Sequence, residues 1–197
     1  MDFIEKLPSF SGFDTILVIV NWLTKQAIFI PAHDTIMSAD LLRMFVLHVF
    51  SKYGIPSHVT SSRGSEFVSN FFWSLGTALD MWLHFTSGYH PEGDEQTKHT
   101  NQTLEQYFHV YCNYQQDNWS ELLPLAEFVY NNAPSATISV SPFFTNKRYH
   151  LNITVHPECN IAFSRARDFA VDLNELQSTL KAEISAAQQH YQKSTDV

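Results

Sequence analysis

The stretch FDTILVIVNWLTKQAIFIPA, residues 13–32, decides the fold of this chain. It holds two apolar runs rich in β-branched residues, at 13–22 and 25–32, and such runs favour β-strands. Because the runs follow each other closely, they predict an antiparallel hairpin. Neither run alternates regularly between apolar and polar residues, so we expect both faces of the hairpin to be buried.

Helical spacing follows the hairpin, at residues 38–53. Leu41, Phe45 and Val49 recur at steps of four and predict the inner face of a helix, for which Ser38 is a suitable N-cap. Further elements are predicted in this order: a strand at 58–61, a helix around 69–80, a strand at 82–87, a long helix from about 95 to 115, and a helix at 118–133 that is broken at its Pro124. With a candidate strand at residues 1–4, these elements indicate an α/β fold in which a mixed five-stranded sheet is flanked by helices.

The character of the chain changes after Pro157. We expect a main domain over residues 1–157 and, because residues 158–197 are polar and helix-favouring, a long amphipathic helix beyond it. The narrow apolar stripe of that helix consists of Phe169, Leu173, Leu176, Leu180, Ile184, Ala187 and Tyr191. The stripe suits either packing on the main domain or self-association into a homodimer, and the sequence favours neither.

The charge balance excludes one class of function. Twelve Lys and Arg residues oppose 20 Asp and Glu residues, which gives a net charge of −8. Avid nucleic-acid binders gain affinity by neutralising phosphates, so this balance argues against non-specific DNA binding, although not against a local basic patch. The chain has no basic, apolar leader and no apolar run approaching about 18 residues, and we therefore expect an intracellular protein that is neither secreted nor inserted in a membrane.

Three positions are predicted to meet at one end of the sheet. Asp2 lies on the first strand, and Ser62 follows the fourth strand, whose neighbour in such a sheet is the first. Lys98 lies in the first turns of the long helix, with thirty-five residues between it and Ser62. Strand ends of this kind are where α/β enzymes place their catalytic groups.

With these positions, the chain resembles the catalytic core of retroviral-type integrases from gypsy-type LTR retrotransposons. The resemblance covers most of the chain and rests on six blocks: MDFIEKLP, FDTILVIVNWLTKQAIFIPA, SSRGSEFVSNFFWSL, GYHPEGDEQTKHTNQTLEQY, DNWSELLPLAEFVYNNAPSATISVSPFF and ARDFAVDLNEL. It implies a ribonuclease-H-like fold and an ancestral role in DNA integration, in the nucleus. In the family, an Asp on the first strand, an Asp after the fourth strand and a Glu on the long helix hold two Mg²⁺ or Mn²⁺ ions for displacement at phosphorus.

Only the first of these three acids is carried over. Asp2 matches it, whereas Ser62 stands where the family has Asp and Lys98 where it has Glu. Asn21 likewise replaces an expected Asp. A hydroxyl is a weak ligand for Mg²⁺ and an ammonium repels it, so we expect weak metal binding at Asp2 at most, and no cofactor. We further expect Lys98 to form an ion pair with Asp2 in place of the metal.

Other residues bear on activity and binding. The acids that would have to rescue the site are Glu66, Asp94, Glu95 and Glu105. In the family the long helix and the loop before it lie along DNA, which implies weak contact with DNA or RNA. The residues expected to make this contact are Arg63, Gln96, His99, Asn101 and Gln102.

The resemblance and its departures lead to one prediction with two alternatives. We predict a retrotransposon integrase core that has become a pseudoenzyme, with residual nucleic-acid binding. One alternative is an active Mg-dependent polynucleotidyl transferase whose ligands have relocated. The other is a non-catalytic scaffold for protein interactions.

Overall fold

The computed structural model describes residues 1–62, 67, 69–85, 95–112, 118–135, 138–149 and 151. Strands β1 (Asp2–Ile4), β2 (Thr15–Val20) and β3 (Ala27–Ala32) form an antiparallel sheet in that order. Strands β4 (His58–Ser61) and β5 (Trp82–Phe85) pair in parallel. The hairpin of β2 and β3 and the burial of both its faces are thus confirmed.

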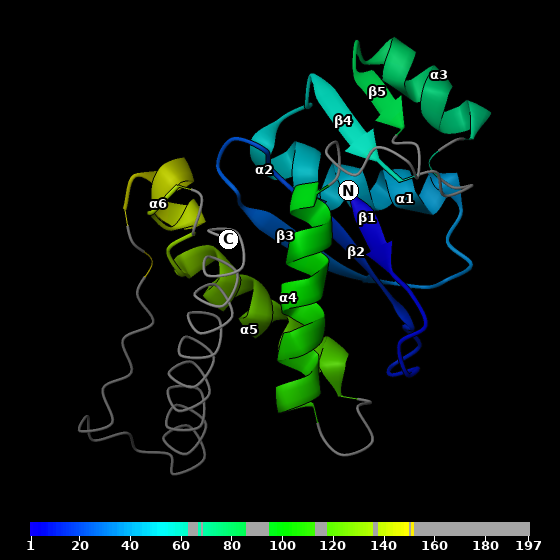
Figure 1. Ribbon diagram of the computed structural model, residues 1–197. Helices are drawn as coiled ribbons and strands as arrows, with labels where there is room; N and C mark the ends of the chain where they lie inside the picture. The colour runs from blue at the N-terminus through cyan, green and yellow to red at the C-terminus, as the bar shows by residue number, and fades with distance from the viewer. Residues whose placement is uncertain are drawn as a thin grey trace, which may run out of the picture.

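The two groups of strands meet at β1 and β4. The Met1 nitrogen donates a hydrogen bond of 2.7 Å to the Thr60 carbonyl oxygen. The arrows of β1 and β4 point the same way in Figure 1, as in a parallel pair. The sheet that the sequence predicts as one unit is therefore built from a three-stranded and a two-stranded part, joined at this contact.

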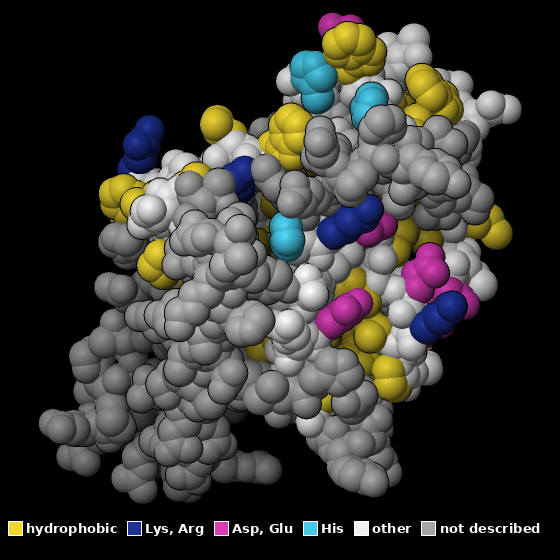
Figure 2. All heavy atoms as spheres, viewed as in Figure 1, with side chains coloured by type: hydrophobic (Ala, Val, Ile, Leu, Met, Phe, Trp, Pro, Cys, Tyr) yellow, Lys and Arg dark blue, Asp and Glu magenta, His cyan; other side chains and the backbone are white. Residues whose placement is uncertain are grey.

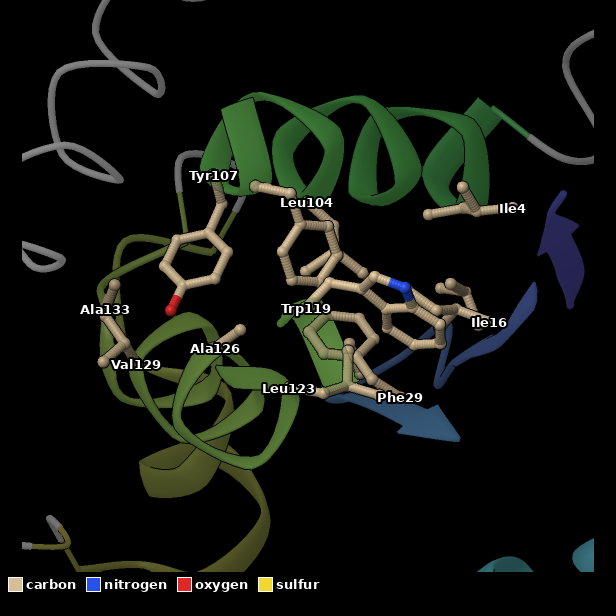
Figure 3. Close-up of a cluster of buried hydrophobic side chains, with 13 residues drawn as sticks. Ile4, Ile16, Phe29, Leu104, Tyr107, Trp119, Leu123, Ala126, Val129 and Ala133 are labelled. Carbon is tan, nitrogen blue, oxygen red and sulfur yellow. The ribbon is translucent and has the colours of Figure 1, made fainter. Parts of the chain in front are cut away.

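One face of the sheet is covered by α4 (Glu95–Tyr111) and α5 (Trp119–Asn132). Figure 3 shows the core between them, in which Trp119 lies among side chains of both helices and of β2 and β3. The Trp119 indole is 1% exposed, and its Nε1 donates to the Pro8 carbonyl oxygen at 2.8 Å. Burial of the indole therefore leaves no unpaired N–H, which would be costly.

The opposite face is covered by a helix that runs from residue 38 to 53 and by α3 (Asn70–Ala78). The first is described as α1 (Ser38–Phe45), a π-helical turn η1 (Val46–Phe50) and α2 (Ser51–Tyr53). Leu41, Phe45 and Val49 are buried in it, as predicted. The prediction of Ser38 as N-cap is wrong by one residue, because Met37 has the extended backbone of the cap and Ser38 is already helical.

Two further features of the helices differ from the predictions. α5 continues through Pro124 without a break. Proline removes one backbone hydrogen bond there, but Leu123 and Ala126 on either side are both buried in the core and hold the two halves in line. A short helix that was not predicted, α6 (Pro142–Lys147), begins after Ser141, whose hydroxyl accepts from the Phe144 N–H at 3.2 Å.

Side chains from α5 cover the outer edge of β3. Asn131 is fully buried and bonds both backbone groups of Ala27, since its Oδ1 accepts from the N–H at 2.8 Å and its Nδ2 donates to the carbonyl at 2.7 Å. Glu127, one turn earlier, accepts from the Phe29 N–H at 2.9 Å. The next residue whose backbone faces away from β2 is Pro31, which has no N–H group. The edge is thus closed to pairing with another strand.

The predicted boundary at residue 157 and the helix at 158–197 lie outside the described residues. No helix in the part of the chain that the structure describes has the length and apolar character needed to cross a membrane.

Candidate catalytic site

Asp2 lies on the α4 face of the sheet. Side chains alternate along β1, and the neighbouring Phe3 packs in the opposite core, where its ring stacks on that of Phe67 at 5.1 Å. In the register of β1 and β2, Asp2 is paired with Val18, whose side chain belongs to the core under α4. The carboxylate is half-buried at the start of the strand.

Ser62 lies at the same end of the sheet as Asp2. The hydrogen bond from the Met1 nitrogen to the Thr60 carbonyl aligns the start of β1 with the end of β4. Because the two strands run in the same direction, the residue after Met1 is level with the end of β4, which Ser62 follows directly. Ser62 is half-buried, and its side chain offers a metal one neutral hydroxyl in place of a carboxylate.

The partner of Asp2 on α4 is Asn101, not Lys98. The Asn101 Nδ2 donates to the Asp2 Oδ2 at 3.3 Å. Thr97 is buried against the sheet, and Asn101 lies four residues later on the same helix face. Lys98 is rotated about 100° from Thr97 around the helix, so its side chain is exposed.

The expected ion pair between Lys98 and Asp2 is therefore wrong. Within 4.0 Å, the ion pair found among the described residues is that of Arg43 with Asp40, at 3.3 Å on the exposed side of α1. An ammonium in water gains little from a pair and loses side-chain freedom in making it. The phase of α4 thus leaves the carboxylate to the shorter amide of Asn101.

The side chains at this end of the sheet do not fit a site for two Mg²⁺ ions. They supply one carboxylate, one hydroxyl, and an amide whose nitrogen points at that carboxylate, whereas Mg²⁺ demands near-octahedral oxygen ligands. No group of three or more His, Cys, Asp or Glu residues that could hold a metal exists within the described ranges. Of the acids considered for rescue, Glu105 is exposed on α4, while Glu66, Asp94 and the side chain of Glu95 lie outside what the structure describes.

Asn21 retains the function that an Asp would have at its position. Its Oδ1 accepts from the N–H groups of Leu23 and Thr24, at 3.0 and 2.9 Å, and so closes the turn between β2 and β3. An Asp carboxylate makes the same Asx turn. This departure from the family pattern is therefore structurally silent, unlike those at Ser62 and Lys98.

The residues expected to contact nucleic acid are divided among several environments. His99 and Gln102 are exposed on α4, and Asn101 is half-buried on Asp2. Arg63 and the side chain of Gln96 lie outside the described residues. The exposed side chains of β5, Trp82 and His84, were not predicted as a binding surface, although they alternate with Leu83 and Phe85 in WLHF and so carried a period-two signal.

No protein-family model matches the chain. Over 149 residues, 76% of its length, it is 30% identical to several transposon polyproteins of Schizosaccharomyces pombe, among them the Tf2-3 and Tf2-4 polyproteins. The chain spans only 11% of the length of these curated relatives.

Solved structures of similar fold are retroviral integrases. A chain of the simian T-cell lymphotropic virus intasome, in complex with PP2A regulatory subunit B56 gamma, matches with a TM-score of 0.56 and 18% identity over 77% of this chain and 55% of that one. The HTLV-2 integrase catalytic core domain in complex with magnesium matches with 0.55 and 13%, over 72% of this chain and 91% of that one. The BIV integrase catalytic core domain matches with 0.52 and 14%, over 72% and 90%. The chain has the ribonuclease-H-like fold of integrase catalytic cores, and the resemblance read from its sequence is confirmed.

Proposed function

We propose that this relative of transposon polyproteins, which has the fold of an integrase catalytic core, is a retrotransposon integrase domain that no longer transfers DNA strands. The observation that supports the loss of activity is the environment of Asp2. Its carboxylate accepts a hydrogen bond from Asn101, and the two positions at which the family has further carboxylates for a two-ion mechanism hold Ser62 and Lys98. One carboxylate is too few to replace the hydration shell of a pair of divalent ions.

We extend the proposal to weak binding of nucleic acid. On α4, the side chains of Lys98, His99 and Gln102 are exposed and are of types that donate hydrogen bonds to phosphates or base edges. The net charge of −8 limits what phosphate contacts can contribute, so binding is expected to be weak.

Restoration of the acids tests the loss of activity. Titration with Mn²⁺, followed by calorimetry or by the electron paramagnetic resonance of free Mn²⁺, compares the unaltered protein with Ser62→Asp/Lys98→Glu. A matched control is Ser74→Asp/Lys147→Glu, which makes the same change in charge at exposed positions of α3 and α6. We expect the restored protein to bind Mn²⁺ at least about tenfold more tightly than both others, which is about 1.4 kcal/mol of binding energy.

Two results would contradict the proposal. If the unaltered protein binds two Mn²⁺ ions and Asp2→Asn abolishes this binding, the metal ligands have relocated, which would support the alternative of an active polynucleotidyl transferase. If it joins labelled DNA ends in Mg²⁺ or Mn²⁺, and Asp2→Asn abolishes the product, the domain is active. Equal Mn²⁺ affinity of the restored protein and the charge-matched control would instead show that Ser62 and Lys98 are not placed as we describe.

A further inference from the structure

The short parallel sheet of β4 and β5 has one face that is buried and one that is open. Val59, Leu83 and Phe85 pack in the core under α3. The residues that alternate with them, His58, Thr60, Trp82 and His84, therefore lie on the other face. His58, Trp82 and His84 are exposed and Thr60 is half-buried; the Trp82 side chain is 75% exposed. We call these four residues the β4–β5 face.

This face is continuous with the end of the sheet that holds Asp2. Asp2 lies on the same side of the sheet as α4, and the Met1 nitrogen bonds the carbonyl of Thr60 within the β4–β5 face. Of the described helices, α4 contacts β1 and β2, and Lys98 is exposed on this helix. Figure 2, viewed from this side, shows hydrophobic and histidine side chains gathered over β4 and β5, above a mixed charged area.

The chemistry of the face selects its ligand. Its side chains are an indole, two imidazoles and a hydroxyl, with no aliphatic side chain. The rings of His58 and Trp82 are cross-strand neighbours with centroids 5.6 Å apart and planes inclined by 53°. A flat ring with polar edges makes the fullest use of such a surface, because it stacks on the indole and forms hydrogen bonds with the imidazoles and the hydroxyl beside it. Nucleobases are rings of this kind, and they stack on aromatic side chains in sequence-tolerant binding.

The charge of the β4–β5 face further restricts the class of ligand. The β4–β5 face itself contains no Lys, Arg, Asp or Glu, and Asp80 lies two residues before Trp82, so the face has no excess of cations. With few phosphates neutralised, affinity has to come from the bases, and bases are accessible only where they are unpaired. The same reasoning requires a shallow dependence of affinity on salt.

We propose that the β4–β5 face is a stacking platform for unpaired nucleotides, with Trp82 as its main contact. This inference rests on the nucleic-acid binding in the proposed function and names the form of nucleic acid and the surface that holds it. The ligand is a single strand, or the frayed end of a duplex, that passes from the β4–β5 face toward Asp2.

The test measures fluorescence anisotropy of a labelled strand of about 15 nucleotides, free or annealed as a blunt duplex, at about 50 and 200 mM salt. The variants are Trp82→Ala and Trp82→Phe. The matched control is Trp22→Ala, because Trp22 is 65% exposed at the turn between β2 and β3 and is not part of the β4–β5 face. We expect Trp82→Ala to weaken single-strand binding about tenfold, Trp82→Phe to retain most of the affinity, and Trp22→Ala to change nothing.

The outcomes distinguish the stacking platform from nucleic-acid binding elsewhere on the domain. Tighter binding of the single strand than of the duplex, lost in Trp82→Ala and kept in Trp22→Ala, supports the platform. If Trp82→Ala and Trp22→Ala bind the strand equally well, or if the duplex binds better, the platform is overturned while nucleic-acid binding by the domain stands. If the unaltered protein binds neither form at either salt concentration, the platform and the nucleic-acid part of the proposed function both fail.

Discussion

Glu127 and Asn131 perform the same task on α5 with different chemistry. The amide of Asn131 satisfies both backbone groups of Ala27, whereas the carboxylate of Glu127 can only accept, from the N–H of Phe29. Burial raises the pKa of Glu127 above its ordinary 4.5, and the Phe29 N–H and the nearby Lys52 oppose that rise without cancelling it. The charge at residue 127 is therefore held at a cost to stability.

Glu127→Gln should remove that cost. Because the pKa of Glu127 is higher in the folded than in the unfolded chain, the folded state binds the proton more tightly, and stability falls as the pH rises from 4.5 through the folded pKa. A Gln keeps the bond from the Phe29 N–H and adds a donor, as Asn131 has. We expect the variant to be more stable by about 1 kcal/mol at pH 7 and equal to the unaltered protein below about pH 4.5, in urea unfolding at several pH values.

The control for this prediction is Glu121→Gln, on an exposed turn of the same helix. Because its side chain is exposed, it should give none of the gain in stability at pH 7 that Glu127→Gln gives. A Glu127→Gln variant that is less stable at pH 7 than at pH 4.5, by the same margin as the unaltered protein, would show that the burial of this carboxylate carries no cost.

At the scale of elements, apolar patterning predicted the helices and strands that depend only on the local sequence. The hairpin of β2 and β3, the strand at 58–61 and the buried positions Leu41, Phe45 and Val49 follow from local runs and spacings, which do not depend on neighbours. The break at Pro124 was wrong because tertiary packing of α5 overrides a local preference. α6 is too short to show a period.

The elements that carry the candidate site were predictable, but its contacts were not. Asp2 lies on β1, Ser62 follows β4 and Lys98 lies on α4, as the predicted order of elements requires, while the meeting of the three residues in one site stays a prediction. Which side chain of α4 reaches Asp2 depends on the rotation of the helix over the sheet. That rotation is set by the burial of Thr97 and Thr100 and was not readable from spacing alone.

Gly76 controls the distance between α3 and β5. A Cβ at this position would lie 2.7 Å from Cδ1 and 2.8 Å from Cγ of Leu83, whose side chain is itself buried. Alanine is normally favoured over glycine within a helix by up to about 1 kcal/mol, but here the clash should dominate. We expect Gly76→Ala to lower the free energy of unfolding by about 1–3 kcal/mol, measured with urea.

Relief of the clash is the control for that explanation. Leu83→Ala alone leaves a cavity and destabilises, whereas in the double variant the new methyl group occupies part of it. The two changes should therefore be less than additive, with a coupling of about 1 kcal/mol or more. Strict additivity would show that Gly76 is not needed for the close approach.

At the scale of the whole molecule, one sheet carries two cores. Ile16 and Val18 point into the core of α4 and α5, and Leu17 between them points into the core of α1 and α3. All three are fully buried, so β2 has no free face. The two cores share this strand, and a cooperative domain of this size is expected to unfold as one unit.

Trp119, the first residue of α5, makes that expectation testable. Its indole is buried in the core of α4 and α5, whereas the other three Trp residues are exposed, so a change in the fluorescence of a buried Trp reports on this core. Leu41→Ala removes a fully buried side chain from the opposite core and should lower stability by about 2–5 kcal/mol. If β2 couples the cores, Leu41→Ala should lower the urea concentration at the midpoint of the Trp119 transition, although no residue of the Trp119 core has changed. The control Leu47→Ala, at an exposed position of η1, should leave that midpoint unchanged. An unmoved Trp119 midpoint in Leu41→Ala, with the far core already unfolded by hydrogen exchange, would mean that the sheet separates the two cores instead of joining them.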